Sequence, residues 1–424
     1  MKKYTIAIIG CGSRGRYAYG ETLFKRKEQF EIVSVCDIDQ RKLDRAKQDW
    51  GIPEENLFLD ENVFFEKKRA DALVLATQDR DHVRMCTRAL QLGYDVLLEK
   101  PISPVKEELE ELLAAQKQYG GEVMVCHVLR YAPAFLKIKQ VLDSGVIGKL
   151  VRLEALEQVS YWHQAHSFVR GNWRNEAETS PMIMQKCCHD LDLLQYYVGA
   201  KGKEVYSVGD LSFFTKENQP EGAADTCKDC KYINECPYSA ERLYIERWKH
   251  VGCPADSWPY NVVDMHKPNT EQTLRAGYEN SGYGRCVFAC DNDVVDNQMV
   301  AITFENGVKA TLTMTAFTSR GGRKMVFHGT HGEMELDESA GTFRISPYGQ
   351  EQTVLKISEI IAAQAEDDSF GHGGGDARLV HSFYDMLDKG KTADTSLESS
   401  VESHLLALAA EESRKTGKIV RVHS

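Results

Sequence analysis

A short apolar segment that runs directly into a glycine-rich turn is the feature that most constrains the fold. Residues 4–9 are nearly all apolar, as in a parallel strand covered on both faces. They lead into Gly10-Cys11-Gly12-Ser13-Arg14-Gly15, a G-x-G-x-x-G turn. In such a turn the first glycine permits the bend, the second lets a pyrophosphate approach the backbone, and the third lets the next helix pack closely. The pattern predicts a strand, turn and helix that hold a dinucleotide at the helix N-terminus.

An acidic residue at the end of the next strand selects the dinucleotide. Residues 31–36 have the composition of a strand and end in Asp37, which lies 22 residues after Gly15. A carboxylate there accepts hydrogen bonds from the ribose hydroxyls of NAD and repels the 2′-phosphate of NADP. NAD is therefore the predicted cofactor. NADP is the second candidate, because Arg41 and Lys42 follow closely and could reach a phosphate.

Two further strand-like segments place polar residues at one edge of the sheet. Residues 72–76 and 95–98 are separated by a helical stretch, as in a doubly wound parallel sheet. Open sheets of this class bind ligands at the carboxyl ends of their strands. Four residues follow these two strands and are expected at the cofactor site: Thr77, Gln78, Glu99 and Lys100.

Taken in chain order, these residues resemble the Gfo/Idh/MocA family of oxidoreductases. The resemblance is carried by the glycine-rich turn, Asp37, Ala76-Thr77 with His82 nearby, Glu99-Lys100-Pro101 and Arg130-Tyr131. It implies an α/β Rossmann domain that binds NAD(P), residues 1–130, and an α+β domain with a large, mostly antiparallel open sheet, residues 131–424. It also implies that His82 lies at the cofactor site and that Lys100 lies beside nicotinamide and substrate.

The C-terminal part of the chain carries the pattern of an antiparallel sheet. Residues 300–304 and 308–314 alternate around Asn306-Gly307, a type I′ hairpin signal. Such a sheet has one face that can pack on another subunit, so a homodimer or homotetramer through this sheet matches what the resemblance implies. A glycine-rich loop at 371–376 is a candidate cover for the site, with His372 as a candidate substrate ligand, and the helices after it are expected to be structural.

Residues 181–194 are predicted to form the helix that carries the proton chemistry. Gln185, Lys186, His189 and Asp192 fall on neighbouring faces by their spacing. In the family, the histidine and the aspartate three residues later contact substrate, and an acid commonly precedes the histidine by four residues. This chain has Gln185 there, and glutamine cannot accept a proton. His189 is therefore the expected base, Lys100 the second choice, and Lys186 a residue that could share the role.

Aromatic, histidine and arginine side chains gather between residues 161 and 174. Aromatic rings pack on the apolar faces of sugars, while imidazole and guanidinium groups bind hydroxyls or a carboxylate. The alternative is a surface loop fixed by a buried tryptophan. The expected substrate contacts are Arg130, Tyr161, His163, His166, Arg170, Trp173, Arg174, Gln185 and Asp192.

Four of the twelve cysteines have the spacing of metal ligands. They are Cys227, Cys230, Cys236 and Cys253, in the pattern C-x₂-C-x₅-C-x₁₆-C. Zinc is the leading candidate, an iron–sulfur cluster is the second, and free buried cysteines are the alternative. Residues that could replace a ligand are Cys286, Cys290 and His250. The cluster is predicted to lie in an insertion at about 225–260 that has no core of its own and is held by the metal.

Composition narrows the class of function. The 424 residues carry 52 basic and 63 acidic side chains, a net charge of −11, which argues against nucleic acid or an anionic membrane as the partner. The sequence has neither a long apolar stretch nor a signal peptide, so a cytoplasmic location is expected. The leading hypothesis is an NAD-dependent oxidoreductase that transfers hydride between nicotinamide and a hydroxyl or keto carbon of a sugar, sugar derivative or cyclitol. The alternatives are a glycosidase that uses NAD for transient oxidation and elimination, and a non-enzymatic nucleotide-sensing regulator.

Overall fold

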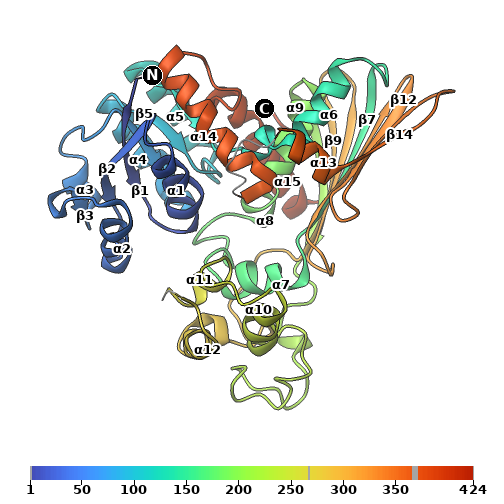
Figure 1. The fold of residues 1–424 in the computed structure, drawn as a ribbon. Helices are drawn as coiled ribbons and strands as arrows, with labels where there is room; N and C mark the ends of the chain where they lie inside the picture. Colours follow the sequence, from blue (N-terminus) through green and yellow to red (C-terminus); the bar gives the residue numbers. More distant parts are fainter. Residues whose placement is uncertain (1, 266–267, 365–370, 424) are drawn as a thin grey trace.

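A six-stranded parallel sheet forms the N-terminal domain (Figure 1). The structure is a computed structural model that describes residues 2–265, 268–364 and 371–423. The strand order is β3-β2-β1-β4-β5-β6. The strands are β1 (Tyr4–Ile9), β2 (Phe30–Cys36), β3 (Leu57–Phe58), β4 (Ala72–Leu75), β5 (Asp95–Leu98) and β6 (Val123–Val125). The central strands are buried on both faces, so the predicted Rossmann-like domain is confirmed.

Helices cover both faces of this sheet, and α2 and α3 begin at aspartates whose side chains cap them. In α2, for example, the Asp39 side chain accepts the Arg41 N–H at the start, and Gly51 adopts φ 71° at the end. The helical segments of this domain are η1 (Ser13–Gly20), α1 (Glu21–Lys25), α2 (Gln40–Trp50), η2 (Glu54–Asn56), α3 (Glu61–Phe64), η3 (Asp79–Asp81), α4 (His82–Gln91), α5 (Lys106–Tyr119) and η4 (Val128–Tyr131).

A nine-stranded sheet forms the second domain, in the order β14-β13-β12-β11-β7-β10-β9-β8-β15. The pair β7 and β10 is parallel and the other pairs are antiparallel, which confirms the mostly antiparallel sheet. The predicted hairpin joins β9 to β10, with Gly307 at φ 85°. The strands are β7 (Leu150–Gln158), β8 (Gly202–Asp210), β9 (Asn297–Phe304), β10 (Lys309–Thr315), β11 (Gly322–Gly329), β12 (Gly332–Asp337), β13 (Thr342–Pro347), β14 (Thr353–Lys356) and β15 (Val420–Arg421).

Helices near the C-terminus join the second domain to the first. α15 packs on β8 and α9 and also on α5 and β6 of the Rossmann-like domain, while α14 packs on η1 and η4. The helices are α6 (Pro133–Asp143), α8 (Met182–Gln185), α9 (Cys188–Val198), α13 (Ile357–Gln364), α14 (Gly371–Lys389) and α15 (Leu397–Thr416). The predicted helix at 181–194 is therefore two helices. In the described ranges, no helix is long and apolar enough to cross a membrane.

The cysteine-rich insertion is longer than predicted and has its own core. It occupies residues 211–296 between β8 and β9 and projects away from both sheets (Figure 1). Its helical segments are η6 (Lys216–Asn218), η7 (Arg242–Glu246), α10 (Arg247–His250), α11 (Tyr260–Val263), α12 (Glu271–Glu279) and η8 (Gly282–Gly284). Tyr244, Trp248, Tyr260 and Tyr278 are buried in one cluster. The prediction of a coreless segment at 225–260 is therefore wrong, because these aromatic residues bury enough apolar surface to form a core.

Candidate active site

The glycine-rich turn leaves open space in front of Gly12. A Cβ atom at Gly10 would lie 2.4 Å from the Ala76 carbonyl oxygen, and one at Gly15 would lie 1.9 Å from the Gly10 carbonyl oxygen. A Cβ atom at Gly12 would meet nothing within 4 Å. The first and third glycines are therefore required for close packing inside the protein, whereas the second leaves room for a ligand. This is the arrangement that a pyrophosphate at the N-terminal end of η1, at Ser13, requires.

Asp37 follows β2 and stabilises this turn by hydrogen bonds. Its carboxylate accepts the Cys11 N–H at 2.7 Å and the Asp39 N–H at 2.9 Å, and Lys42 Nζ lies 3.3 Å away. Arg41 donates to Asp39 and is largely exposed. The acidic side chain therefore lies beside the turn, where the predicted ribose contact places it.

Arg14 ties the turn to α14. Its guanidinium donates to Glu99 Oε1 at 2.6 Å and to Asp376 Oδ1 at 2.8 Å. Tyr19 also donates to Glu99 Oε1. Against the effect of burial, the Arg14 cation holds the pKa of Asp376 well below its usual range. Arg14 thus orders the start of α14, where His372 lies, as well as the predicted cofactor turn.

The ends of β4 and β5 carry the remaining predicted cofactor residues. Gln78 is exposed, and Thr77 Oγ1 is a buried hydroxyl without a hydrogen-bond partner in the described structure, as a ligand-facing group would be. His82 Nδ1 lies 2.7 Å from the Pro101 carbonyl oxygen, which can only accept, so Nδ1 carries the proton. His82 therefore holds the turn that presents Lys100.

Gln185 orients Lys100. Lys100 Nζ donates to the Gln185 carbonyl oxygen at 2.8 Å and lies 3.5 Å from its Oε1. The Gln185 amide donates to both Asp79 carboxylate oxygens, at 3.1 and 3.2 Å, and Asp79 also accepts from Ser180 Oγ at 2.6 Å. Gln185 cannot take a proton, but it connects the Lys100 ammonium to a buried carboxylate.

His189 is a buried, neutral imidazole beside Lys100. Burial, the Lys100 charge and other nearby cationic groups hold the pKa of His189 well below its usual range. Its ring centre lies 5.9 Å from that of His127 and 6.0 Å from that of His372, and its Nδ1 has no partner among the described residues. A neutral imidazole with a free nitrogen can accept a proton. His189 is thus suited to the role of base.

His127, Cys188 and His189 have ligand atoms within 4.8 Å of one another, and no other such set of three occurs in the described ranges. Lys100 is among the charges that lower the pKa of both histidines after burial. A metal cation would be repelled by the same charge. His127 was not singled out in the sequence, although its place just after β6, at the carboxyl edge, could have indicated it.

Lys186 belongs to a buried ionic network rather than to an open helix face. Its Nζ lies 3.0 Å from Glu157, and Arg323 pairs with Glu157 at 3.0 Å and with Asp190 at 2.8 Å. Although burial opposes ionisation, Arg323 and Lys186 hold the pKa of Glu157 below its usual range. Lys186 is one-fifth exposed, whereas its partner carboxylate is buried.

Arg130 and Asp192 bind each other instead of facing a substrate. The guanidinium makes two hydrogen bonds to the carboxylate, at 2.7 and 2.5 Å, and a third to the Asp394 carbonyl oxygen at 2.9 Å. Their side chains are 6% and 1% exposed. The pair joins η4 to α9 and to the segment before α15, so we assign both residues to the scaffold and not to the substrate contacts predicted for them.

Some side chains of the 161–174 segment pack inside the protein, and others lie near Lys100 and Lys186. His166 is buried, accepts or donates a hydrogen bond with Tyr244 at 3.0 Å and stacks on Tyr283. Arg170 is buried under the insertion, Arg174 pairs with Asp291, and Trp173 packs near Phe168. His166, Arg170 and Arg174 therefore contact the insertion, whereas Trp173 packs on the main core cluster, and all four are assigned to packing.

His163 is the member of the segment that lies near the lysines of the site. Burial lowers the pKa of His163, and the charges of Lys186 and Lys100 lower it further. Its ring lies 4.8 Å from that of Trp258 in the insertion, and Trp162 and Tyr161 are partly exposed beside it. No local spacing in the sequence marks Trp258.

Asp256 links the insertion to the Rossmann-like domain. It accepts the Tyr17 hydroxyl at 2.9 Å and the Arg45 guanidinium at 3.2 Å, and Arg45 also donates to the Met265 carbonyl oxygen at 3.1 Å. Tyr17 is in η1 and Arg45 in α2, the two elements that flank the predicted cofactor site. The insertion therefore contacts the Rossmann-like domain directly beside the predicted cofactor site.

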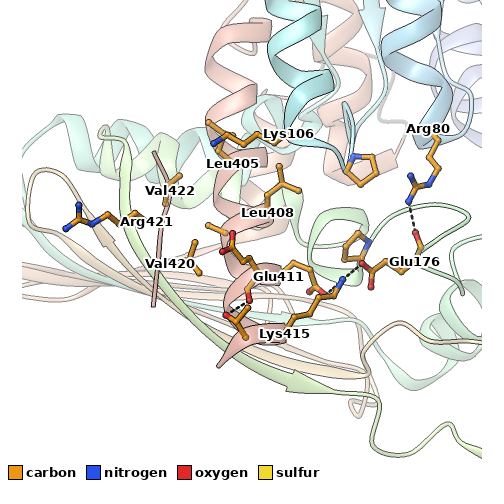
Figure 2. A pocket seen from close by; sticks show the side chains of 15 residues that line it. Arg80, Lys106, Glu176, Leu405, Leu408, Glu411, Lys415, Val420, Arg421 and Val422 are labelled. Atoms are coloured by element: carbon orange, nitrogen blue, oxygen red, sulfur yellow. Dashed lines mark hydrogen bonds and ion pairs between the residues drawn. The ribbon is translucent and has the colours of Figure 1, made fainter. Parts of the chain in front are cut away.

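A separate cavity of about 480 Å³ opens along α15 (Figure 2). Leu405 and Leu408 line it together with charged side chains, and Lys415 pairs with Glu176 across it. None of the predicted catalytic residues lines this cavity.

The four predicted metal ligands are not gathered in one place. Cys253 is exposed after α10, and no three of the four thiols form a set within 4.8 Å in the part of the chain that the structure describes. All the described cysteines are free.

Family models match both domains. The Gfo/Idh/MocA model described as "Oxidoreductase family, NAD-binding Rossmann fold" matches residues 4–127, and the model of the family's C-terminal alpha/beta domain matches residues 139–422. The chain belongs to the Gfo/Idh/MocA oxidoreductase family. The NAD-binding domain predicted from the glycine-rich turn is thereby confirmed.

Relatives in the Gfo/Idh/MocA family include an oxidoreductase, P35, of Formosa agariphila, which is 29% identical over 68% of this chain and 83% of its own. An inositol 2-dehydrogenase of Rubrobacter xylanophilus is 23% identical over 49% of this chain and 56% of its own. Among solved structures, the WlbA dehydrogenase of Bordetella pertussis, in complex with NADH and UDP-GlcNAcA, matches with a TM-score of 0.69 and 16% identity over 99% of this chain and 98% of that one. The structural match shows a shared fold.

Proposed function

We propose that the protein is an NAD-dependent oxidoreductase that transfers hydride between nicotinamide and a CH–OH carbon of a sugar, sugar derivative or cyclitol. The observation that carries the proposal is a neutral, buried His189 beside an oriented Lys100 ammonium at the carboxyl edge of the sheet. The nicotinamide ring, when bound, accepts or donates the hydride. The open space at Gly12 and the unpartnered Thr77 hydroxyl fit the cofactor.

The chain's own residues supply the proton transfer. His189 takes the proton of the substrate hydroxyl as hydride leaves the same carbon, and returns it in the reverse reaction. Lys100 donates a hydrogen bond to that oxygen and stabilises its developing negative charge. Gln185 and Asp79 fix the Lys100 ammonium, and Lys186, the next residue in the chain, adds positive charge. His163, Trp162 and Tyr161 provide the partly exposed surface for a sugar ring.

The substrate class rests on the chemistry of this cleft and on the relatives. One relative is named an inositol dehydrogenase, and one similar structure is a dehydrogenase in complex with UDP-GlcNAcA. Inositol and the sugar of UDP-GlcNAcA are both cyclic polyhydroxy compounds. The second candidate is glycoside cleavage by transient oxidation and elimination, which uses the same residues. The regulator is disfavoured, because a sensor needs no unpartnered base beside an ammonium.

NAD is the proposed form of the cofactor, since Asp37 would repel a 2′-phosphate. We also propose a homo-oligomer that forms through the open face of the nine-stranded sheet. Tyr206, Val208, Met299 and Val354 are large apolar residues exposed on that face, and β8 pairs Val208 directly with Met299. Sedimentation of wild type and Met299→Asp would test this contact, and an unchanged mass for the variant would contradict it.

The experiment is a substrate screen with NAD and NADP. Free sugars, uronic acids, inositols and aryl glycosides are each incubated with the protein, and NADH formation and glycoside cleavage are measured. NADH formed with a free sugar or cyclitol supports the proposal, whereas cleavage without net NADH supports the second candidate. Absence of turnover with every class, in a protein that binds NAD, would favour the regulator.

A further inference from the structure

Arg170 is a buried cation without a carboxylate partner. Its side chain is 4% exposed, and no carboxylate oxygen in the described ranges lies within 4.0 Å of it. Nε donates to the Arg285 carbonyl oxygen and Nη2 to the Tyr238 carbonyl oxygen, each at 2.7 Å, while Nη1 has no partner in the described structure. An uncompensated buried charge is strongly destabilising, so a negative group is needed next to this guanidinium.

The side chain that contacts the Arg170 guanidinium is the thiol of Cys227. Nη2 lies 3.6 Å from Cys227 Sγ. Cys227 Sγ also lies 3.8 Å from the Arg285 carbonyl oxygen, which accepts from Arg170 Nε. Neutral thiols would not compensate the cation, whereas thiolates held by a metal would.

The backbone brings three chain segments with cysteines together at this point. Cys230 N–H donates to the Cys227 carbonyl oxygen, as in a metal-binding knuckle, and the Ala240 N–H points at Cys227 Sγ at 3.3 Å. A two-strand bridge places Cys286 beside Cys227: the Cys227 N–H donates to Gly284 and the Cys286 N–H donates to Asp225, each at 2.8 Å. The Ser239 N–H donates to the Cys236 carbonyl oxygen at 3.1 Å, so one turn joins Cys236 to Ala240, the residue that contacts Cys227.

We propose that Cys227, Cys230, Cys236 and Cys286 bind one structural Zn²⁺, with Arg170 compensating the negative charge of the tetrathiolate. Zn²⁺ with four thiolates carries a charge of −2 and forms as four thiols release their protons to solvent, without any redox change. This ligand set replaces the exposed Cys253 of the sequence pattern with Cys286, which is distant in sequence but adjacent across the bridge.

The thiols must move closer together to bind the ion. They do not form a set within 4.8 Å in the described structure, and tetrahedral zinc holds its sulfurs closer than that. Cys230 and Cys236 are partly exposed on a segment without helix or strand, and zinc binding would require this segment and its side chains to adjust. The ion would join the 227–236 segment to Cys286, next to the bridge residue Arg285, at one side of the insertion core.

Metal content of the full-length protein tests the proposal. We expect about one equivalent of zinc per chain after expression with added zinc, and retention of zinc in Cys253→Ser and Cys290→Ser but loss in Cys230→Ser and Cys286→Ser. Loss of zinc in Cys253→Ser with retention in Cys286→Ser would overturn the ligand set. Iron with inorganic sulfide in place of zinc would overturn the metal.

A second measurement avoids variants that fail to fold. Wild-type protein depleted of metal is titrated with Co²⁺, which gives intense thiolate-to-cobalt absorption when four cysteines bind it. Saturation at about one equivalent, reversed by zinc, supports the site, and absence of this absorption overturns it. In Arg170→Met, Co²⁺ affinity is expected to fall about tenfold or more, because the compensating charge is lost. Lys249→Met, which removes an exposed cation of the same insertion, is the control and should leave the affinity unchanged.

Discussion

Replacement of Gly12 by alanine separates the cofactor role of the glycine-rich turn from its packing role. Gly12 has φ −75°, which alanine adopts without strain, and a Cβ atom there would meet nothing within 4 Å. The protein without cofactor should therefore fold normally. Its free energy of unfolding is expected to be unchanged or to rise by about 0.4–1 kcal/mol, because alanine reduces the entropy of the unfolded chain.

NAD binding should fall in the same variant. The added methyl group would occupy the space through which a phosphate reaches the backbone N–H groups at the start of η1. Loss of one hydrogen bond to a charged group costs about 1.5–3 kcal/mol, which corresponds to an increase of about 10- to 150-fold in Kd.

Calorimetric titration with NAD and thermal unfolding without it measure the two effects. Gly15→Ala is the matched control, since its Cβ atom would lie 1.9 Å from a backbone oxygen and should lower stability by about 1–3 kcal/mol or more. If Gly12→Ala binds NAD as tightly as wild type, the phosphate is not placed at Gly12. If Gly12→Ala loses much stability, the space in front of Gly12 is not open.

Three further predictions concern the cleft and the scaffold. His189→Asn and Lys100→Met should each lower kcat by about 10²- to 10⁴-fold in steady-state assays, while His189→Asn leaves the calorimetric Kd of NAD unchanged. A loss of NAD affinity in His189→Asn as large as its loss of kcat would contradict the assignment. Because burial and Lys100 hold the pKa of His189 well below 6.5, the base stays neutral as pH falls through 6.5, and the pH–rate profile should lack an acid limb there. Removal of the positive charge in Lys100→Met should raise the pKa of His189 and move the acid limb of the profile to higher pH. If wild type shows an acid limb near pH 6.5 that is lost in His189→Asn, the reasoning that His189 is a neutral base is wrong. Arg130→Met leaves the Asp192 carboxylate buried and unpaired, so urea unfolding should show a loss of about 3–5 kcal/mol, largely recovered in Arg130→Met/Asp192→Leu; no difference between the single and double variants would contradict a buried pair.

The parts of the site that the sequence predicts are those fixed by local geometry. The glycine-rich turn, Asp37 and Lys100 each follow a strand directly, and the carboxyl ends of parallel strands meet at one edge of a sheet. Family resemblance added His82 and the role of Lys100. The helix at 181–194 was predicted too, but its break after Gln185 was not, since nothing in its composition interrupts a helix there.

The site residues that we reassign to packing make contacts between parts of the chain that are far apart in sequence. In the sequence Arg130 and Asp192 have the character of polar site residues, because nothing there shows that they form hydrogen bonds with each other. His166 and Arg170 lie in a polar-aromatic segment, yet the insertion that covers them begins about 40 residues later. Cys286 is a nearer neighbour of Cys227 than sequence spacing indicates, because a strand bridge and not a short loop joins them.

The bridge made by the insertion also restricts how the two domains can move. Asp256 is fixed to Tyr17 and Arg45 of the Rossmann-like domain, and Trp258, two residues later, lies against His163 of the second domain. Two residues of extended chain span at most about 7 Å, so these two sets of contacts cannot separate far while both are kept. A large rotation of one domain relative to the other would therefore have to break the Asp256 contacts or the packing of Trp258.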